Sequence, residues 1–186
     1  MVDARVLQTQ SVLAEAILEL AGTKPVAQVS VAELTRRAGI NRATFYDHFS
    51  SPGELLASVA TSELDAVRDL DHQLRAQGER SPRDITRSAV RSVVVMIDTH
   101  RDTFALALLD ARDASLHRGL IAHLQVSCQY HVETYVSDPT VVGREAVVAR
   151  FVAEGIIGGI ESWLASPTMT VDEVTDAILI AMPAWW

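Results

Sequence analysis

The sequence predicts an all-α protein of nine helices. Apolar residues recur at spacings of three and four along most of the chain, and breaks rich in Gly, Pro and Ser separate these segments. No stretch shows the apolar–polar alternation bounded by hairpin turns that is typical of β-strands. The expected helices occupy residues 4–21, two short segments within 30–49, and 52–77, 82–100, 103–111, 115–137, 143–166 and 171–182.

The composition is that of a globular protein, with 48% hydrophobic and 22% charged residues. No run approaches the roughly 20 apolar residues of a membrane span. The first residues lack the basic and apolar blocks of a signal peptide. We therefore expect a cytoplasmic protein with no membrane partner. The single cysteine, Cys128, excludes an intrachain disulfide.

The first helix of the 30–49 segment has clear start and stop signals. Ser30 is expected to cap it, with Glu33 returning a hydrogen bond to the Ser30 backbone in a capping box. Leu34 faces the core, while Arg36 is left toward solvent or phosphate. Gly39 ends the helix because the residue just past a helix often needs a positive φ, which glycine adopts without steric cost.

The second helix of this segment begins after Asn41, whose side chain can cap it. Phe45 and Phe49 share its buried face. The other residues lie around the remaining sides: Arg42, Ala43, Thr44, Tyr46, Asp47 and His48. Two short helices joined by a glycine turn form a helix-turn-helix, whose second helix enters the DNA major groove.

From Ser30 to about Leu56 the chain resembles the DNA-binding domain of the TetR family of transcriptional repressors. That family's recognition segment typically reads alanine-glycine-valine, a cap, then threonine-leucine-tyrosine, a variable position, histidine or tyrosine, and phenylalanine. Residues 38–49 here read AGINRATFYDHF. One departure is Pro52, near the position where the family usually has a lysine, because proline offers a phosphate neither a cation nor an N–H.

The resemblance implies three helices in a helix-turn-helix DNA-binding domain, residues 1–50, followed by a helical effector-binding and dimerisation domain, residues 51–186. It also implies a ligand-responsive repressor that binds a pseudo-palindromic double-stranded DNA operator as a homodimer. No catalytic motif, metal site or cofactor site is evident. Two alternatives stay open, a helical dimeric interaction module and an all-α enzyme with an inert helix-turn-helix.

Within the motif, Arg42 and Thr44 are expected to read base edges, since arginine donates twice to guanine and threonine contacts the thymine methyl. Tyr46 and His48 are expected to bind phosphate, the alternative for Tyr46 being packing beside Phe45. The predicted DNA-binding residues are Ser30, Arg36, Asn41, Arg42, Ala43, Thr44, Tyr46 and His48.

The formal net charge of −8 is unevenly distributed. Five basic and six acidic side chains give residues 1–56 a net charge of −1, which leaves −7 for the rest. A reading domain that is not strongly basic predicts few phosphate contacts per subunit and a modest salt dependence of operator binding.

Three glycines lie within five residues of the predicted 143–166 helix: Gly155, Gly158 and Gly159. Each costs roughly 1 kcal/mol relative to alanine, which indicates a close helix contact in compensation. That contact is either a neighbouring helix of the same chain or a subunit interface. The resemblance favours a four-helix dimer interface built from the last two helices. The predicted interface residues are Phe151, Gly155, Ile156, Gly159, Ile160 and Trp163.

The resemblance also implies a ligand pocket among the middle helices. Cys128 and His131 interrupt an apolar face of the 115–137 helix, and the alternative is that both belong to a satisfied core. Paired carboxylates such as Asp69 and Asp71, and histidines such as His123, are expected on the surface. The predicted ligand-binding residues are Ile97, His100, Phe104, Leu124, Cys128 and His131. A largely apolar lining predicts a hydrophobic or amphipathic small-molecule effector.

Overall fold

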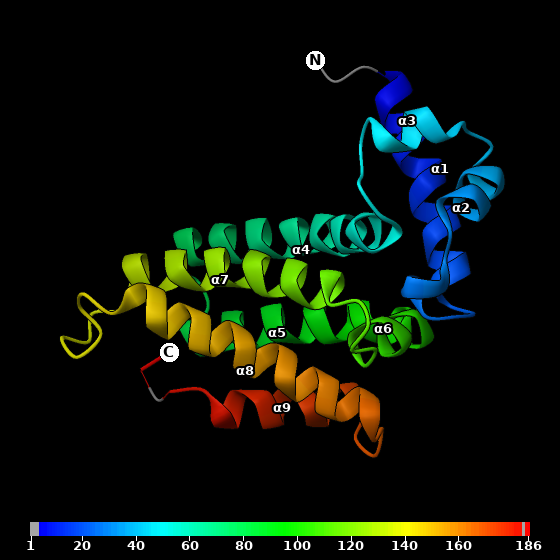
Figure 1. The fold of residues 1–186 in the computed structure, drawn as a ribbon. Coiled ribbons are helices and arrows are strands. Elements are labelled where there is room, and N and C mark those ends of the chain that lie inside the picture. Colours follow the sequence, from blue (N-terminus) through cyan, green and yellow to red (C-terminus); the bar gives the residue numbers. More distant parts are fainter. Residues whose placement is uncertain (1–3, 184) are drawn as a thin grey trace. The chain divides into compact units, whose positions relative to one another are not determined.

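The computed structural model describes residues 4–183 and 185–186 (Figure 1). Over these residues it contains nine α-helices and no strand, as predicted. The helices are α1 (Ala4–Ala21), α2 (Val31–Ala38), α3 (Arg42–Tyr46), α4 (Pro52–Gln77), α5 (Pro82–Thr99), α6 (Arg101–Leu108), α7 (Ser115–Tyr135), α8 (Glu145–Ala165) and α9 (Val171–Ala181), with a 3₁₀ turn at Val26–Gln28. Among the described residues, no helix combines the length and apolarity needed to cross a membrane.

Serine caps followed by proline begin two of the long helices. The Ser51 hydroxyl accepts a hydrogen bond from the Glu54 N–H at 3.1 Å at the start of α4. The Ser81 hydroxyl does the same for Asp84 at 3.1 Å at the start of α5. In each helix proline is the first residue, where its missing N–H leaves no intrahelical bond unmade.

The chain divides into two compact units. The first comprises the residues up to Ala60 together with His100–Gly119, and the second comprises Thr61–Thr99 with Leu120–Trp186. The first unit therefore contains α1, α2, α3 and α6, with the beginnings of α4 and α7. Its core includes Leu13, Leu34 and Phe45, all fully buried.

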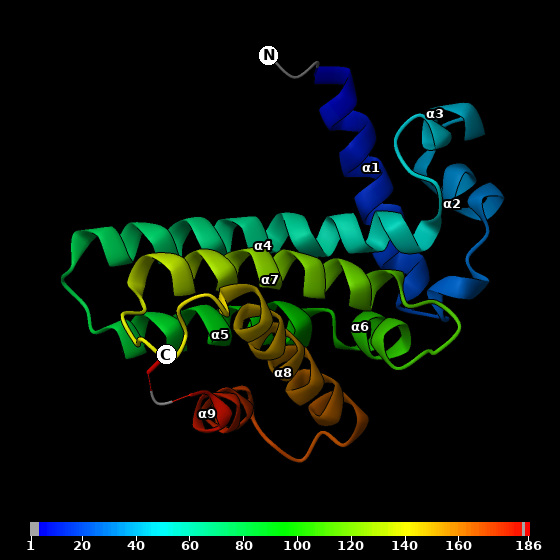
Figure 2. The same cartoon turned by 60° about the vertical axis from the view of Figure 1, so that its left-hand side comes forward.

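The second unit contains α5, α8 and α9 with most of α4 and α7. Helices α4, α7 and α5 lie side by side in both views (Figure 1 and Figure 2). Ion pairs join α5 to α9: Arg87 Nη2 lies 2.9 Å from Asp176 Oδ1, and Arg91 Nε lies 2.7 Å from Asp172 Oδ1. Because these pairs are exposed, each contributes less than about 1 kcal/mol, and the packing of α9 against α5 and α8 supplies most of the stability.

Candidate functional site

The start of α2 has the predicted serine cap. The Ser30 hydroxyl accepts from the Glu33 N–H at 3.2 Å. The Glu33 carboxylate accepts from Lys24 Nζ at 2.6 Å, and this charge-assisted bond is the main cause that lowers the pKa of Glu33. The predicted hydrogen bond between the Glu33 carboxylate and the Ser30 backbone is a smaller cause of the same shift.

The turn of the motif has the predicted geometry. Gly39 adopts φ 68°, in the left-handed region, and ends α2. Asn41 caps α3, its Oδ1 accepting from the Thr44 N–H at 2.8 Å and from the Thr44 hydroxyl at 3.1 Å. The Thr44 hydroxyl is therefore occupied by the cap, which leaves its methyl group for base contact. The helix ends at Tyr46, earlier than the predicted segment, because Asp47 forms its C-cap.

One face of α3 is anchored and the other is free. Phe45 is completely buried, and the ring of Tyr46 contacts it edge-on at 5.4 Å while remaining 59% exposed. Tyr46 thus both packs and presents its hydroxyl outward. Of the other predicted DNA-binding residues, Thr44 and His48 are half-buried and the remainder are exposed: Ser30, Arg36, Asn41, Arg42 and Ala43.

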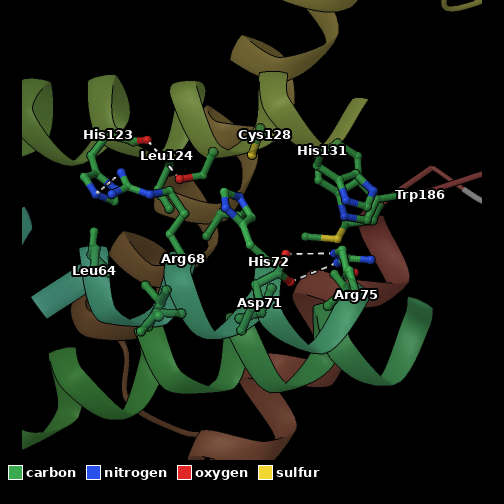
Figure 3. Close-up of a pocket in the computed structure, with 18 residues that line it drawn as sticks. Leu64, Arg68, Asp71, His72, Arg75, His123, Leu124, Cys128, His131 and Trp186 are labelled. Atoms are coloured by element: carbon green, nitrogen blue, oxygen red, sulfur yellow. Dashed lines mark hydrogen bonds and ion pairs between the residues drawn. The ribbon is translucent and has the colours of Figure 1, made fainter. Parts of the chain in front are cut away.

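The second unit contains a cavity of about 90 Å³ (Figure 3). Helices α4, α5, α7 and α8 and the residues after α9 form its wall. The apolar lining residues are Leu64, Val67, Ala89, Val90, Val93, Leu124, Ile156 and Met182. The polar and aromatic ones are Arg68, Asp71, His72, Arg75, Thr86, His123, Ser127, Cys128, His131 and Trp186.

Half of the predicted ligand-binding set lies in this wall, namely Leu124, Cys128 and His131. Three predicted residues do not line the cavity, and the structure corrects their placement. Ile97 is completely buried one turn beyond Val93, the last residue of α5 in the wall. His100 and Phe104 belong to the first unit, where Phe104 is a core residue.

The sequence analysis missed the polar side of α4. Arg75 Nε and Nη2 donate to the Asp71 carboxylate at 2.8 and 3.0 Å, and Nη2 also donates to the Thr86 hydroxyl at 2.9 Å. The Arg75 and Asp71 side chains are 5% and 16% exposed, so the expected solvated position of Asp71 was wrong. The signal was present in the sequence, because Leu64, Arg68, Asp71 and Arg75 share one helical face.

His123 is also not a surface histidine. Its side chain is 11% exposed, and its Nε2 lies 2.9 Å from Asp65 Oδ1. Its Nδ1 atom is buried without a hydrogen-bond partner among the described residues, as is Nδ1 of His131. The cavity wall therefore includes two polar atoms whose hydrogen-bonding capacity is unused, and each carries a desolvation cost.

Burial keeps Cys128 and His131 of α7 neutral at physiological pH. It raises the pKa of the Cys128 thiol to about 12, which prevents thiolate formation. Burial, together with the nearby Arg75 cation, lowers the pKa of His131 to about 4. The His131 ring also stacks on that of Trp186, with centroids 4.5 Å apart.

The predicted dimer residues separate into two groups. Ile156, Ile160 and Trp163 are at most 6% exposed within the single chain, and the Trp163 indole N–H donates to the Met169 carbonyl at 2.8 Å. These three side chains belong to the core, so their assignment to a partner-facing surface is corrected. The apolar face of α8 points inward, where α9 and the rest of the second unit cover it.

Gly159 provides the close approach of α8 to α9 within the chain, since a Cβ there would lie 3.0 Å from Ile178 Cγ1. This matches the alternative of a same-chain contact. A Cβ at Gly155 or Gly158 would meet nothing within 4 Å. Together with Val147 and Phe151, 74% and 72% exposed, these two glycines form a solvent-facing line that we call the exposed α8 stripe.

The family model described as "Bacterial regulatory proteins, tetR family" matches residues 13–59, which contain the whole helix-turn-helix. Residues 13–59 are therefore similar to the DNA-binding part of the TetR family. A curated relative, "Uncharacterized HTH-type transcriptional regulator YxbF" of Bacillus subtilis (strain 168), is 39% identical over 59 residues, which cover 31% of this chain and 16% of that protein. The matched segment thus spans about a sixth of the relative's length.

Solved structures extend the likeness of this chain over its second unit. Thermus thermophilus FadR, a TetR-family repressor in complex with lauroyl-CoA, superposes with a TM-score of 0.67 at 17% identity, covering 92% of this chain and 91% of that one. Bacillus subtilis FadR in complex with stearoyl-CoA gives 0.61 at 10% identity, covering 91% and 95%. At these identities the likeness concerns the fold alone.

Proposed function

We propose that this chain is a ligand-responsive transcriptional regulator of the TetR family, a repressor, that binds a pseudo-palindromic operator as a homodimer in the cytoplasm. The observation that carries the proposal is the construction of α3. Phe45 is fully buried and fixes the helix, while Arg42, Ala43 and Tyr46 remain exposed. A rigidly anchored helix with free side chains is what major-groove readout requires.

Residues 1–50 act as the DNA-binding domain and residues 51–186 as the effector and dimerisation domain. Helix α4 belongs to both compact units, since its first residues pack in one and Leu64 to Arg75 line the cavity in the other. Effector binding would favour a different position of α4 and so change the separation of the two recognition helices. The shift is limited by the effector's differential affinity for the two states.

The exposed α8 stripe supports association of two copies. Phe151 is 72% exposed, and Ile180 on the neighbouring α9 is 80% exposed. Large apolar side chains this exposed on adjacent helices are typical of an interaction surface. The glycines of the stripe lack side chains that would hold another helix at a distance, so close helix packing across a twofold axis is available.

A hydrophobic or amphipathic effector is supported by the lining of the cavity, where apolar side chains surround a few polar atoms. The two FadR proteins of the same fold hold lauroyl-CoA and stearoyl-CoA. In the conformation described here, a cavity of about 90 Å³ has room for only a few water-sized groups. An effector larger than this volume is enclosed only when the wall rearranges.

The test is binding of the purified protein to the DNA upstream of its own gene, measured by electrophoretic mobility shift against an unrelated fragment of equal length. We expect a specific complex containing two chains per site. A dimer that shows no preference for either DNA would contradict the proposal and favour an interaction module. Turnover of a small molecule by protein with no DNA preference would favour an all-α enzyme.

A further inference from the structure

Trp186 forms one end of the cavity wall without being part of a helix. Its indole ring stacks on the His131 imidazole, with centroids 4.5 Å apart and ring planes at 29° (Figure 3). Most of the wall comes from α4, α5, α7 and α8, whereas Met182 and Trp186 follow the end of α9 at Ala181. Trp186 is half-buried, so it is the wall residue that moves with the least disruption of helical structure.

Two residues of the cavity wall contact tyrosines that lie outside it. The rings of His72 and Tyr130 are tilted at 39° with centroids 4.2 Å apart, and those of His131 and Tyr135 are tilted at 41° with centroids 5.7 Å apart. Flat rings at these separations recognise other flat rings by stacking.

The charged groups in the wall are already paired. The Arg75 guanidinium donates twice to Asp71 and once to Thr86, and Arg68 Nη2 lies 2.8 Å from Asp65 Oδ1. The lowered pKa of His131 keeps its ring uncharged at pH 7. An anionic ligand would have to break one of these pairs, so the electrostatics favour an uncharged ligand.

His131 provides an unused hydrogen-bonding atom at the same place. The residue is 7% exposed, and its Nδ1 is buried with no partner among the described residues. A hydrogen bond to Nδ1 lies in the plane of the imidazole, so a flat ring stacked on the face of His131 leaves this atom without a partner. The stacking face of His131, and not its Nδ1, is therefore what a flat ligand contacts.

The volume shows how a ring is accommodated. A cavity of about 150 Å³ admits benzene, whereas this one is about 90 Å³. A ring therefore fits only when part of the wall leaves. The indole of Trp186 already occupies the stacking position on His131, and its departure would open a space of aromatic shape beside the unpartnered Nδ1.

We propose that the effector of this site is an uncharged, planar aromatic compound that replaces the Trp186 indole on the His131 ring. The inference rests on the effector site proposed above and specifies its ligand class. Trp186 acts as an internal competitor. The affinity measured in the wild type therefore equals the affinity of the open cavity multiplied by the fraction of molecules in which the indole is displaced.

The test uses 2-naphthol as the probe and isothermal titration calorimetry on the whole chain at pH 7. Trp186→Ala is expected to tighten 2-naphthol binding between about twofold and tenfold, the range that corresponds to one aromatic stack. Trp185→Phe is the matched control, because Trp185 does not line the cavity and phenylalanine keeps a ring beside Trp186, and the affinity of this variant should equal that of the wild type. 2-Naphthoate, of the same ring size but anionic, should bind at least tenfold more weakly.

Weaker 2-naphthol binding by Trp186→Ala, or tighter binding of 2-naphthoate than of 2-naphthol, would overturn the proposal. Operator binding of the same preparations separates the two proposals. Protein that binds its operator but takes up no 2-naphthol keeps the proposed function and loses this ligand class. Protein that binds no DNA refutes the proposed function whatever the probe does.

A measurement on the unaltered cavity covers the case in which Trp186→Ala does not fold. In protein labelled with 5-fluorotryptophan, Trp185→Phe and Trp186→Phe each remove one resonance, so together they assign all three signals, that of Trp163 by difference. Saturation with 2-naphthol should shift the Trp186 fluorine signal and leave that of the core residue Trp163 unchanged. An unchanged Trp186 signal at saturation would contradict displacement.

Discussion

The carboxylate of Asp113 lies directly against Gly53, the second residue of α4. A Cβ at Gly53 would overlap Asp113 Oδ2 and lie 3.0 Å from Asp113 Cγ. The other carboxylate oxygen, Oδ1, accepts a hydrogen bond from the Ser115 N–H at 2.8 Å in the first turn of α7. The start of α4 and the start of α7 are therefore coupled through one short side chain within the first unit.

Gly53→Ala should destabilise the first unit. The added methyl forces Asp113 to move, and the bond to the Ser115 N–H is lost or lengthened. Loss of such a helix-start bond costs about 1 kcal/mol, observed as a lower midpoint in urea unfolding followed by circular dichroism. Asp113→Ala is the matched variant. In the double variant Gly53→Ala/Asp113→Ala, the glycine substitution should add little to the loss of stability. Additive effects in this double-mutant cycle would contradict the coupling.

Arg42→Ala should weaken operator binding by about 1 to 3 kcal/mol at one base pair while leaving the affinity for unrelated DNA almost unchanged. Arg42 is exposed at the first position of α3 and is free to enter the groove. The measurement is fluorescence anisotropy on the operator and on operators changed one base pair at a time. Equal losses on all sequences would instead identify Arg42 as a phosphate contact.

The order of the helices was predictable because it depends on local signals. The Asn41 cap and the positive φ of Gly39 are short-range features, and each was found where the sequence indicated. The bond from Lys24 to the Glu33 carboxylate was not predictable, since Lys24 lies outside the four-residue capping pattern and reaches Glu33 through tertiary geometry.

The cavity was only partly predictable, because helical periodicity shows which residues share a face but not what that face meets. Cys128 and His131 share a face of α7 and do line the cavity. A lone aspartate on a helix predicts a solvated side chain, but Asp71 is neutralised by Arg75, one turn further along α4. Trp186 follows the last helix, where no periodicity applies, so its stacking on His131 carried no sequence signal.

The exposed α8 stripe predicts that Gly158→Arg abolishes dimer formation without unfolding the chain. No atom lies within 4 Å of a Cβ at this position, and any residue other than proline is better than glycine in a helix interior. Light scattering coupled to size-exclusion chromatography should show a monomer. Val126→Arg, on an exposed position of α7, is the control and should leave the mass unchanged.

Gly159→Ala should have the opposite pattern, a loss of stability with the dimer retained. Its Cβ would lie 3.0 Å from Ile178 Cγ1, so α8 and α9 must separate slightly. Overpacking of this kind costs about 1 to 3 kcal/mol, measured by urea unfolding. A dimeric Gly158→Arg protein would show that the exposed α8 stripe is not the subunit interface.

His131 predicts a loss of stability in mild acid. Its pKa is lowered from 6.5 to about 4 by burial and by Arg75, with Asp71 acting weakly in the opposite direction. The folded state therefore binds fewer protons than the unfolded state between these values, and stability falls as pH drops below 6.5. From pH 7 to pH 5 the expected loss is about 2 kcal/mol. Urea unfolding at both values measures it, and pH 5 lies above the ordinary range of carboxyl pKa values. His131→Phe keeps a ring for Trp186 to stack on and should remove most of this difference, whereas an equal pH dependence in the variant would assign it to other groups.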